Sequence, residues 1–309
     1  MNTNTPAPKT SAIDQTLTRR QYMKLHKKQS LFRLSVRTFM NNRLAVIGTV
    51  IFSIVLFLAV FADVIADYDT KVILIDPIHR LMAPGAEHIL GTDELGRDVF
   101  ARLIHGGRIS LRIGFLAVAL STFIGLVLGA CAGYYGGLTD TIIMRCTDIF
   151  ACLPSMLLAI AIVAAFGNTE FNLLMAIAVS RVPAFARVVR SAVMSVQNMD
   201  YVEAARAIGA RDHTIIFKHV LVNCLGPIIV QMTMSLAASI LAISSLSFIG
   251  LGISAPTPEW GSMLSTARTY MRDYPFLVVA PGMAIFLSSL SLNLMGDGLR
   301  DALDPRMRK

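Results

Sequence analysis

The longest stretch without a charged side chain constrains the fold of this chain most. From Val220 to Pro258 the sequence contains no Asp, Glu, Lys, Arg or His. As a single helix, this run would extend about 58 Å, nearly twice the thickness of the hydrocarbon core of a bilayer. The helix must therefore end inside the run. Gly250 and Gly252, followed by Pro256, predict that it ends near residue 250.

Other apolar runs are also long enough to cross a membrane, which takes about 20 residues of helix because lipid offers the backbone no hydrogen-bond partner. The whole sequence is 54% hydrophobic and only 16% charged, which excludes disorder and most water-soluble folds. We expect an all-α membrane protein with six transmembrane helices. Their expected positions are 44–62, 113–139, 149–169, 171–189, 220–250 and 274–296.

The positive charges indicate how these helices are oriented. Nine of the 28 Lys and Arg residues precede the first helix, and the segment after the last helix is also basic. Because such charges stay on the cytoplasmic side, we expect both termini in the cytoplasm and no nucleic-acid partner. We expect a basic cytoplasmic tail (1–43), a first transmembrane helix (44–66) and an extracytoplasmic loop with an interfacial helix (67–112). A five-helix core (113–297) and a cytoplasmic tail (298–309) follow.

A polar segment interrupts the apolar pattern between the fourth and fifth helices. It reads NMDYVEAARAIGARDHTIIFKHVLVN from Asn198 to Asn223. An alanine-rich helical stretch, a turn at Gly209 and a second amphipathic stretch predict a helix-turn-helix outside the membrane. From amphipathicity alone, this segment could equally be a helix lying on anionic lipid.

The spacing of particular residues within this segment is more specific. Glu203-Ala204-Ala205, followed by Gly209 and then Leu221, resembles the EAA loop of binding-protein-dependent ABC transporter permeases. Val222 departs from the family pattern, which usually has Pro after the Leu. The resemblance implies that the loop forms coupling helices that dock on an ATPase. The ATPase-coupling residues would be Tyr201, Glu203, Ala204, Ala205, Gly209 and Leu221.

Three further stretches narrow the resemblance to the dipeptide, oligopeptide and nickel subgroup, and to its second, C-type permease subunit. They are LGTDELGRDVFARLIHGGRISL, LSFIGLGISAPTPEWGSML and NLMGDGLRDALDP. The resemblance implies the type I ABC importer fold in a bacterial inner membrane. The implied partners are a homologous second permease, two cytoplasmic ATPases that bind ATP and Mg, and an extracytoplasmic solute-binding protein. Di- or oligopeptides are the leading solutes, with nickel or other metal chelates and sugars as alternatives.

Two outer segments carry polar or aromatic residues that could contact a partner. By resemblance, they belong to an outer gate or to the surface that meets the solute-binding protein, although local salt bridges would explain the first segment equally well. The only tryptophan would anchor at the lipid headgroups. The candidate residues are Asp93, Arg97, Asp98, Pro256, Pro258 and Trp260.

Charged residues within the expected spans need a polar environment. Arg181 has no acid within four residues. It could be satisfied by carbonyl groups freed around Pro183, or it could be a pathway cation that attracts a carboxylate. Arg145 and Asp148 are expected to neutralise one another. A ridge of glycines at spacing four is expected to pack closely on another helix. It comprises Gly125, Gly129 and Gly133.

The sequence lacks the motifs of several other functions. It has no Gly-Lys dipeptide, hence no Walker A loop, and no H-E-x-x-H, EF-hand or G-x-S-x-G pattern. We therefore expect no catalytic residue, metal site or cofactor site in this chain. An ion-coupled secondary transporter would need an acid deep in a span, and we expect Asp and Glu only near the ends of the spans. A scaffold bound to membrane lipid through its basic tails is the remaining alternative.

Overall fold

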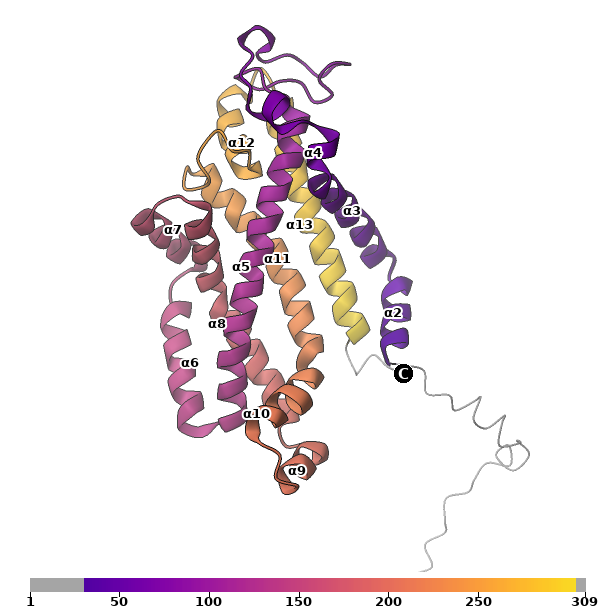
Figure 1. The fold of residues 1–309 in the computed structure, drawn as a ribbon, viewed down its shortest axis with the longest axis vertical. Helices are drawn as coiled ribbons and strands as arrows, with labels where there is room; N and C mark the ends of the chain where they lie inside the picture. The colour runs from indigo at the N-terminus through magenta and orange to yellow at the C-terminus, as the bar shows by residue number, and fades with distance from the viewer. Residues whose placement is uncertain (1–30, 304–309) are drawn as a thin grey trace, which may run out of the picture.

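The structure is a computed structural model that describes residues 31–303, and it is a bundle of long helices (Figure 1). Residues 1–30 of the predicted N-terminal tail and residues 304–309 of the predicted C-terminal tail lie outside the described residues. The long helices are α3 (Arg43–Val60), α5 (Val99–Tyr135), α6 (Gly137–Ala151), α7 (Ser155–Phe166), α8 (Glu170–Val196), α11 (Leu225–Phe248) and α13 (Phe276–Leu303). The shorter ones are α2 (Leu31–Asn41), α4 (Ala62–Ile65), α9 (Asp200–Ala207), α10 (Asp212–Thr214) and α12 (Trp260–Ala267).

The prediction of a six-helix membrane protein is confirmed. Five helical segments are individually long and apolar enough to cross a bilayer, and the bent pair of α6 and α7 is also long and apolar enough, which gives six if the pair is one span. The fifth span ends where the sequence predicts, because Gly250 adopts a φ of +86° that only glycine reaches easily. Helix α8 continues through Pro183 without a break.

Two helix boundaries differ from the predicted ones. Helix α5 begins at Val99 rather than near residue 113, so the predicted interfacial helix is the first part of the span itself. Its start is fixed by Asp98, whose carboxylate accepts a hydrogen bond from the backbone N–H of Ala101 at 2.8 Å. Helix α13 continues to Leu303, into the segment expected to be a cytoplasmic tail.

The third predicted span is not one straight helix. Helices α6 and α7 meet at an angle of 79°, and α7 alone, at 12 residues, would extend only about 18 Å. The break lies between Ala151 and Ser155 and contains Pro154. Proline cannot donate a backbone hydrogen bond, and it disfavours helical geometry at the preceding residue, Leu153. Because the bent segment starts at Gly137, Asp148 lies well inside it, which corrects the expectation that the spans lack acids away from their ends, whereas Asp140 lies in its first turn.

The chain's polar segments are divided between the two ends of the bundle. Helix α2, helix α9 and the end of α13 lie at one end (Figure 1). The segment 67–98 and helix α12 lie at the opposite end. We call these the hairpin end and the lobe end.

The predicted glycine ridge packs helix α5 directly against helix α8. A Cβ atom added at Gly129 would lie 2.7 Å from the Cβ of Val189, and one at Gly133 would lie 2.9 Å from the Cβ of Val193. Neither distance leaves room for a side chain. The glycines therefore allow the two backbones to approach closely and fix α8 against the centre of the bundle.

Candidate functional site

Residues 200–220, which we call the α9 hairpin, project from the hairpin end of the bundle (Figure 1). Helix α9 ends at Ala207, and the chain turns at Gly209, where φ is +78°. No atom lies within 4 Å of a Cβ placed there, so the backbone conformation rather than lack of space favours glycine. The chain then returns through α10 and the π-helical turn Ile215–Val220, as the sequence predicts for a helix-turn-helix.

One side of the α9 hairpin is fixed to the bundle by apolar packing. Val202 is fully buried, and it belongs to one core cluster with Val189 and Val193 of α8. Ala205 and Leu221, two of the predicted ATPase-coupling residues, are buried in the same cluster. Their place in the motif is explained by packing within the chain rather than by surface contact.

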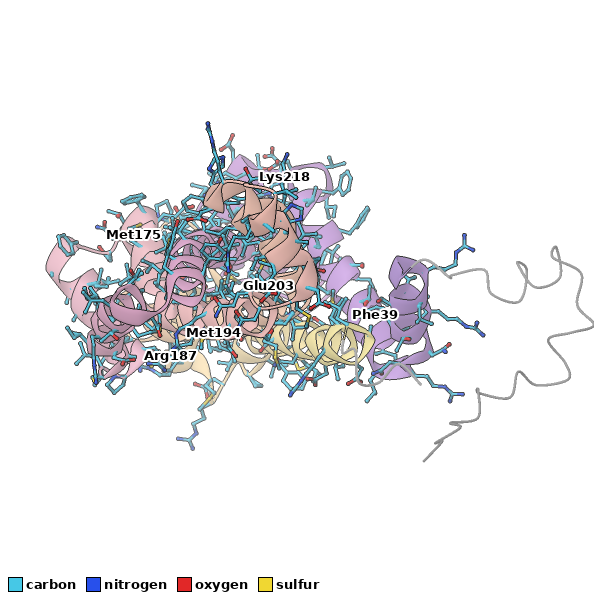
Figure 2. All side chains as sticks on the ribbon, turned by 90° about the horizontal axis from the view of Figure 1, so that it is seen from below. Phe39, Met175, Arg187, Met194, Glu203 and Lys218 are labelled. Carbon is cyan, nitrogen blue, oxygen red and sulfur yellow. The ribbon has the colours of Figure 1, made fainter. Side chains whose placement is uncertain are left out.

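The other side of the α9 hairpin is exposed. The exposed residues are Tyr201, Glu203, Ala204 and Gly209. In the view from this end, Glu203 lies near the middle of the bundle (Figure 2). Within the described residues, the carboxylate of Glu203 forms no ion pair. Two exposed apolar side chains that sequence reasoning did not single out join this surface, Ile208 at 85% and Phe217 at 62% exposed.

A polar contact links the α9 hairpin to the end of helix α5. The hydroxyl of Tyr134 donates a hydrogen bond to the Asp212 carboxylate at 3.0 Å. The guanidinium of Arg206 lies over the Tyr134 ring, 5.5 Å from its centre. Sequence reasoning missed Tyr134, because the contact joins residues that are 78 positions apart.

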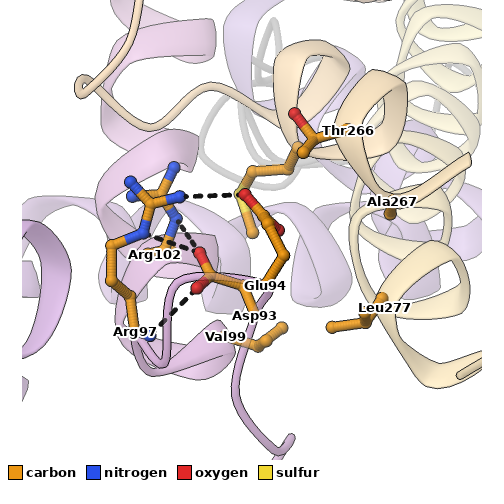
Figure 3. A pocket seen from close by; sticks show the side chains of 9 residues that line it. Asp93, Glu94, Arg97, Val99, Arg102, Thr266, Ala267 and Leu277 are labelled. Atoms are coloured by element: carbon orange, nitrogen blue, oxygen red, sulfur yellow. Dashed lines mark hydrogen bonds and ion pairs between the residues drawn. The ribbon is translucent and has the colours of Figure 1, made fainter. Parts of the chain in front are cut away.

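At the lobe end, Asp93, Arg97 and Asp98 form a buried polar turn, and Figure 3 shows the contact of Asp93 with Arg97. The Asp93 carboxylate accepts hydrogen bonds from the backbone N–H and the Nε of Arg97, at 2.9 and 2.7 Å. Asp98 caps helix α5 and also pairs with His88 at 2.8 Å. These three side chains are thus satisfied within the chain.

Arg102 connects this turn to the second predicted outer segment. Its Nε lies 3.3 Å from the Asp93 carboxylate. Its Nη1 donates hydrogen bonds to the carbonyl oxygens of Val72 and Pro256, at 2.9 and 3.4 Å. The two outer segments, predicted separately from sequence, therefore meet through an arginine that the sequence did not single out. Pro256 itself is exposed, whereas Pro258 is buried.

The sequence suggested that Trp260 anchors at the membrane surface, but the structure buries it. Its side chain is only 2% exposed, and its Nε1 donates a hydrogen bond to the Leu103 carbonyl at 2.8 Å. Gly107 of α5 leaves the space in which the indole packs. The neighbouring Glu259 is fully buried, caps helix α12 at the Ser262 N–H and accepts a hydrogen bond from Ser110 at 2.9 Å.

The charged residues inside the spans are arranged differently from the local pairs expected. Arg181 lies within α8 with its Nε buried and without a hydrogen-bond partner in the described part of the chain, so the carbonyls near Pro183 do not satisfy that atom. Asp148 does not pair with Arg145, three residues before it. Instead it accepts a hydrogen bond from Arg187 of α8 at 3.0 Å.

The sequence matches two protein families. Residues 125–309 match the family described as binding-protein-dependent transport system inner membrane component. Residues 30–84 match the N-terminal TM domain of oligopeptide transport permease C. Together the two matches include most of the described helices, from α2 to α13.

Curated relatives match almost the whole chain. The dipeptide transport system permease protein DppC of Alkalihalophilus pseudofirmus is 44% identical over 90% of this chain and 91% of its own length. The di/tripeptide transport system permease protein DppC of Pseudomonas aeruginosa is 45% identical over 88% and 91%. The glutathione transport system permease protein GsiD of Pectobacterium atrosepticum is 42% identical over 88% and 90%.

Solved structures share the fold at low sequence identity. A chain of the inward-facing MetNI methionine ABC transporter superposes with a TM-score of 0.53 at 18% identity, covering 66% of this chain and 96% of that one. A chain of an amino acid ABC transporter solved with histidines gives 0.50 at 14% identity, covering 64% and 92%. The likeness to each of these structures thus covers about two thirds of this chain.

Proposed function

The chain belongs to the family of binding-protein-dependent transport system inner membrane components, and we propose that it is the C-type permease subunit of an ATP-driven importer of di- or oligopeptides. The observation that carries the solute class is the identity of 42–45% with dipeptide, di/tripeptide and glutathione permeases along nearly the whole chain. We propose that it pairs with a homologous permease and receives its solute from an extracytoplasmic binding protein.

The α9 hairpin is the proposed contact with the ATPases. Its buried side makes it rigid against α8, and its exposed side presents Glu203 with two apolar side chains, Ile208 and Phe217. An exposed apolar patch beside an unpaired carboxylate suits a protein partner better than water. The ATPases would supply the bound ATP and Mg, because this chain has no phosphate-binding loop. The hairpin end, with both described chain ends, would face the cytoplasm.

Movement of the hairpin would be transmitted to the helices through its contacts with α5 and α8. Closure of the ATPases on ATP would move the docked α9 hairpin. The apolar cluster that Val202 shares with α8, and the contact of Asp212 with Tyr134, would carry that movement into the bundle. The residues at the lobe end would form the outer gate. This chain would contribute mechanical coupling and a pathway rather than bond-making chemistry.

Purification of the co-expressed complex tests the assignment of the hairpin. We expect the tagged chain to retrieve an ATPase, and we expect Glu203→Lys or Ile208→Asp to reduce the amount retrieved. Arg272→Gln, an exposed residue near the lobe end, is the matched control. Undiminished retrieval by both hairpin variants would contradict the coupling role.

Uptake by the purified complex in proteoliposomes tests the solute class. With binding protein outside and ATP inside, we expect accumulation of radiolabelled Ala-Ala, and none without ATP. Accumulation of a nickel chelate or a sugar in place of peptides would contradict the peptide assignment while leaving the permease role intact. Uptake driven by an ion gradient without ATP would support a secondary transporter.

A further inference from the structure

A polar groove of about 420 Å³ lies between helices α6 and α8, apart from the α9 hairpin and the lobe end. We call it the α6–α8 groove. Two ion pairs cross it. Arg190 donates to the Asp140 carboxylate at 2.6 Å through its Nη2, and Arg187 pairs with Asp148 at 3.0 Å. The residues that line it are Asp140, Thr141, Met144, Arg145, Asp148, Arg187 and Arg190.

Arg145 is the one charged residue of this groove left without a counter-charge within residues 31–303. Both aspartates are occupied by arginines of α8, and the side chain of Arg145 is exposed. With three arginines and two aspartates, the groove has one positive charge in excess. That excess is located at a guanidinium free to take a ligand.

Arg145 lies within helix α6, which together with α7 is long and apolar enough to be a membrane span. It lies eight residues after Gly137, where the helix begins, or about 12 Å along the axis. Exposed apolar side chains surround it on the same helix, including Leu138, Ile142 and Ile149. A cation at the centre of a span costs at least ~2.5 kcal/mol if it faces lipid. The groove must therefore face water or another protein.

We propose that the α6–α8 groove is a solute-contacting part of the translocation pathway and that Arg145 binds the terminal carboxylate of the passing peptide. This inference rests on the proposed function as a peptide permease. A guanidinium presents two parallel N–H donors that match the two oxygens of a carboxylate. The neighbouring ion pairs hold Arg187 and Arg190 in place and leave Arg145 as the group that responds to the solute.

The first test compares variants of the whole complex in proteoliposomes, with Ala-Ala as the probe and a saturating amount of loaded binding protein. We expect Arg145→Gln to lower Ala-Ala uptake about tenfold, as for loss of one charge-assisted hydrogen bond. Arg145→Lys, which keeps the charge, should retain most of the uptake. Arg300→Gln removes an exposed cation of α13 that does not line the groove and should not change uptake.

The outcomes separate this inference from the proposed function. No Ala-Ala uptake by the wild-type complex would refute the peptide function itself. Normal wild-type uptake with unchanged uptake in Arg145→Gln would overturn only the inference. If Arg145→Gln instead fails to retain the second permease during purification, Arg145 is a subunit contact, and the inference is again overturned.

The second test is chemical and does not require a transport defect. Arg145→Cys is made in a chain whose four native cysteines are replaced by alanine, and the complex is treated with a cationic or an anionic methanethiosulfonate. We expect both reagents to modify the cysteine, because a groove on the translocation pathway is open to water. Only the cationic aminoethyl reagent should restore Ala-Ala uptake, since it returns a positive charge to the groove. An unreactive cysteine, or equal effects of the two reagents, would overturn the inference.

Discussion

At the scale of single residues, the glycines between α5 and α8 decide whether the two helices can meet. Gly129 has no space for a methyl group, because its added Cβ would lie 2.7 Å from the Cβ of Val189. Gly282 of α13 has no atom within 4 Å of an added Cβ. The two positions therefore form a matched pair for one chemical change.

Gly129→Ala is expected to destabilise the chain by about 1–3 kcal/mol, because the added methyl group forces α5 away from α8. Gly282→Ala should be neutral or slightly stabilising, since alanine favours the helix and meets nothing. The temperature of unfolding in the same detergent measures both. Equal unfolding temperatures for the two variants would show that the glycine ridge does not set the α5–α8 distance.

The burial of Trp260 gives a second test at this scale. As the only tryptophan of the chain, it reports alone on its surroundings. The fluorescence of the purified chain is expected to be blue-shifted and resistant to quenching by iodide, because the indole is 2% exposed. Emission typical of a solvated or headgroup-bound indole would contradict the contact with Leu103.

At the scale of the element, local sequence patterns predicted which segments are helical but not which partners they choose. The motif from Glu203 to Gly209 located the α9 hairpin, because its turn needs a left-handed residue. Arg145 and Asp148 were expected to pair because they are three residues apart. The structure instead pairs Asp148 with Arg187, and no local spacing carries information on the packing of α6 against α8.

The contact between helix α5 and the α9 hairpin is expected to stabilise the hairpin against local unfolding. Tyr134→Phe removes the hydrogen bond to Asp212, worth about 0.5–1.5 kcal/mol. Amide hydrogen exchange of residues 200–214 should then become about two- to tenfold faster. Exchange in the lobe-end segment 67–98 serves as the internal control. Unaltered exchange in the hairpin would mean that apolar packing on α8 alone holds it.

The segment 67–98 contains a pair of exposed residues that respond to pH. A hydrogen bond with Asp76 raises the pKa of His79 above its ordinary value of 6.5, and the same bond lowers the pKa of Asp76 below 3.8. The ion pair therefore stabilises the folded segment at pH values between the ordinary pKa values of the two groups, 3.8 and 6.5. The His79 contribution is lost as pH rises through its raised pKa, and the Asp76 contribution is lost as pH falls through its lowered pKa.

Modification of His79 by diethylpyrocarbonate, which requires the neutral imidazole, measures this shift. In the wild-type chain, we expect the midpoint of reactivity to lie above pH 6.5. In Asp76→Asn, the midpoint should move to lower pH, because the negative partner is lost. A midpoint that does not differ between the two chains would contradict the His79–Asp76 contact.

At the scale of the whole molecule, counting apolar residues was sufficient for the number of spans but not for their shape. Hydropathy does not reveal the break before Ser155, because the sequence stays apolar across it. It also does not reveal that the span includes the charged residues of α6. Trp260 was placed at the surface because composition cannot show that Gly107 of α5 leaves a space for it. These features depend on contacts between distant segments.

We propose that the chain is moved by a partner ATPase through the α9 hairpin. Site-specific photo-crosslinking in the assembled complex tests it most directly, with the crosslinker at position 208 of the hairpin or at position 78 of the lobe end, two sites of similar exposure at 85% and 86%. We expect a crosslink to an ATPase from position 208 and none from position 78. An ATPase crosslink from position 78, or only lipid adducts from position 208, would contradict it.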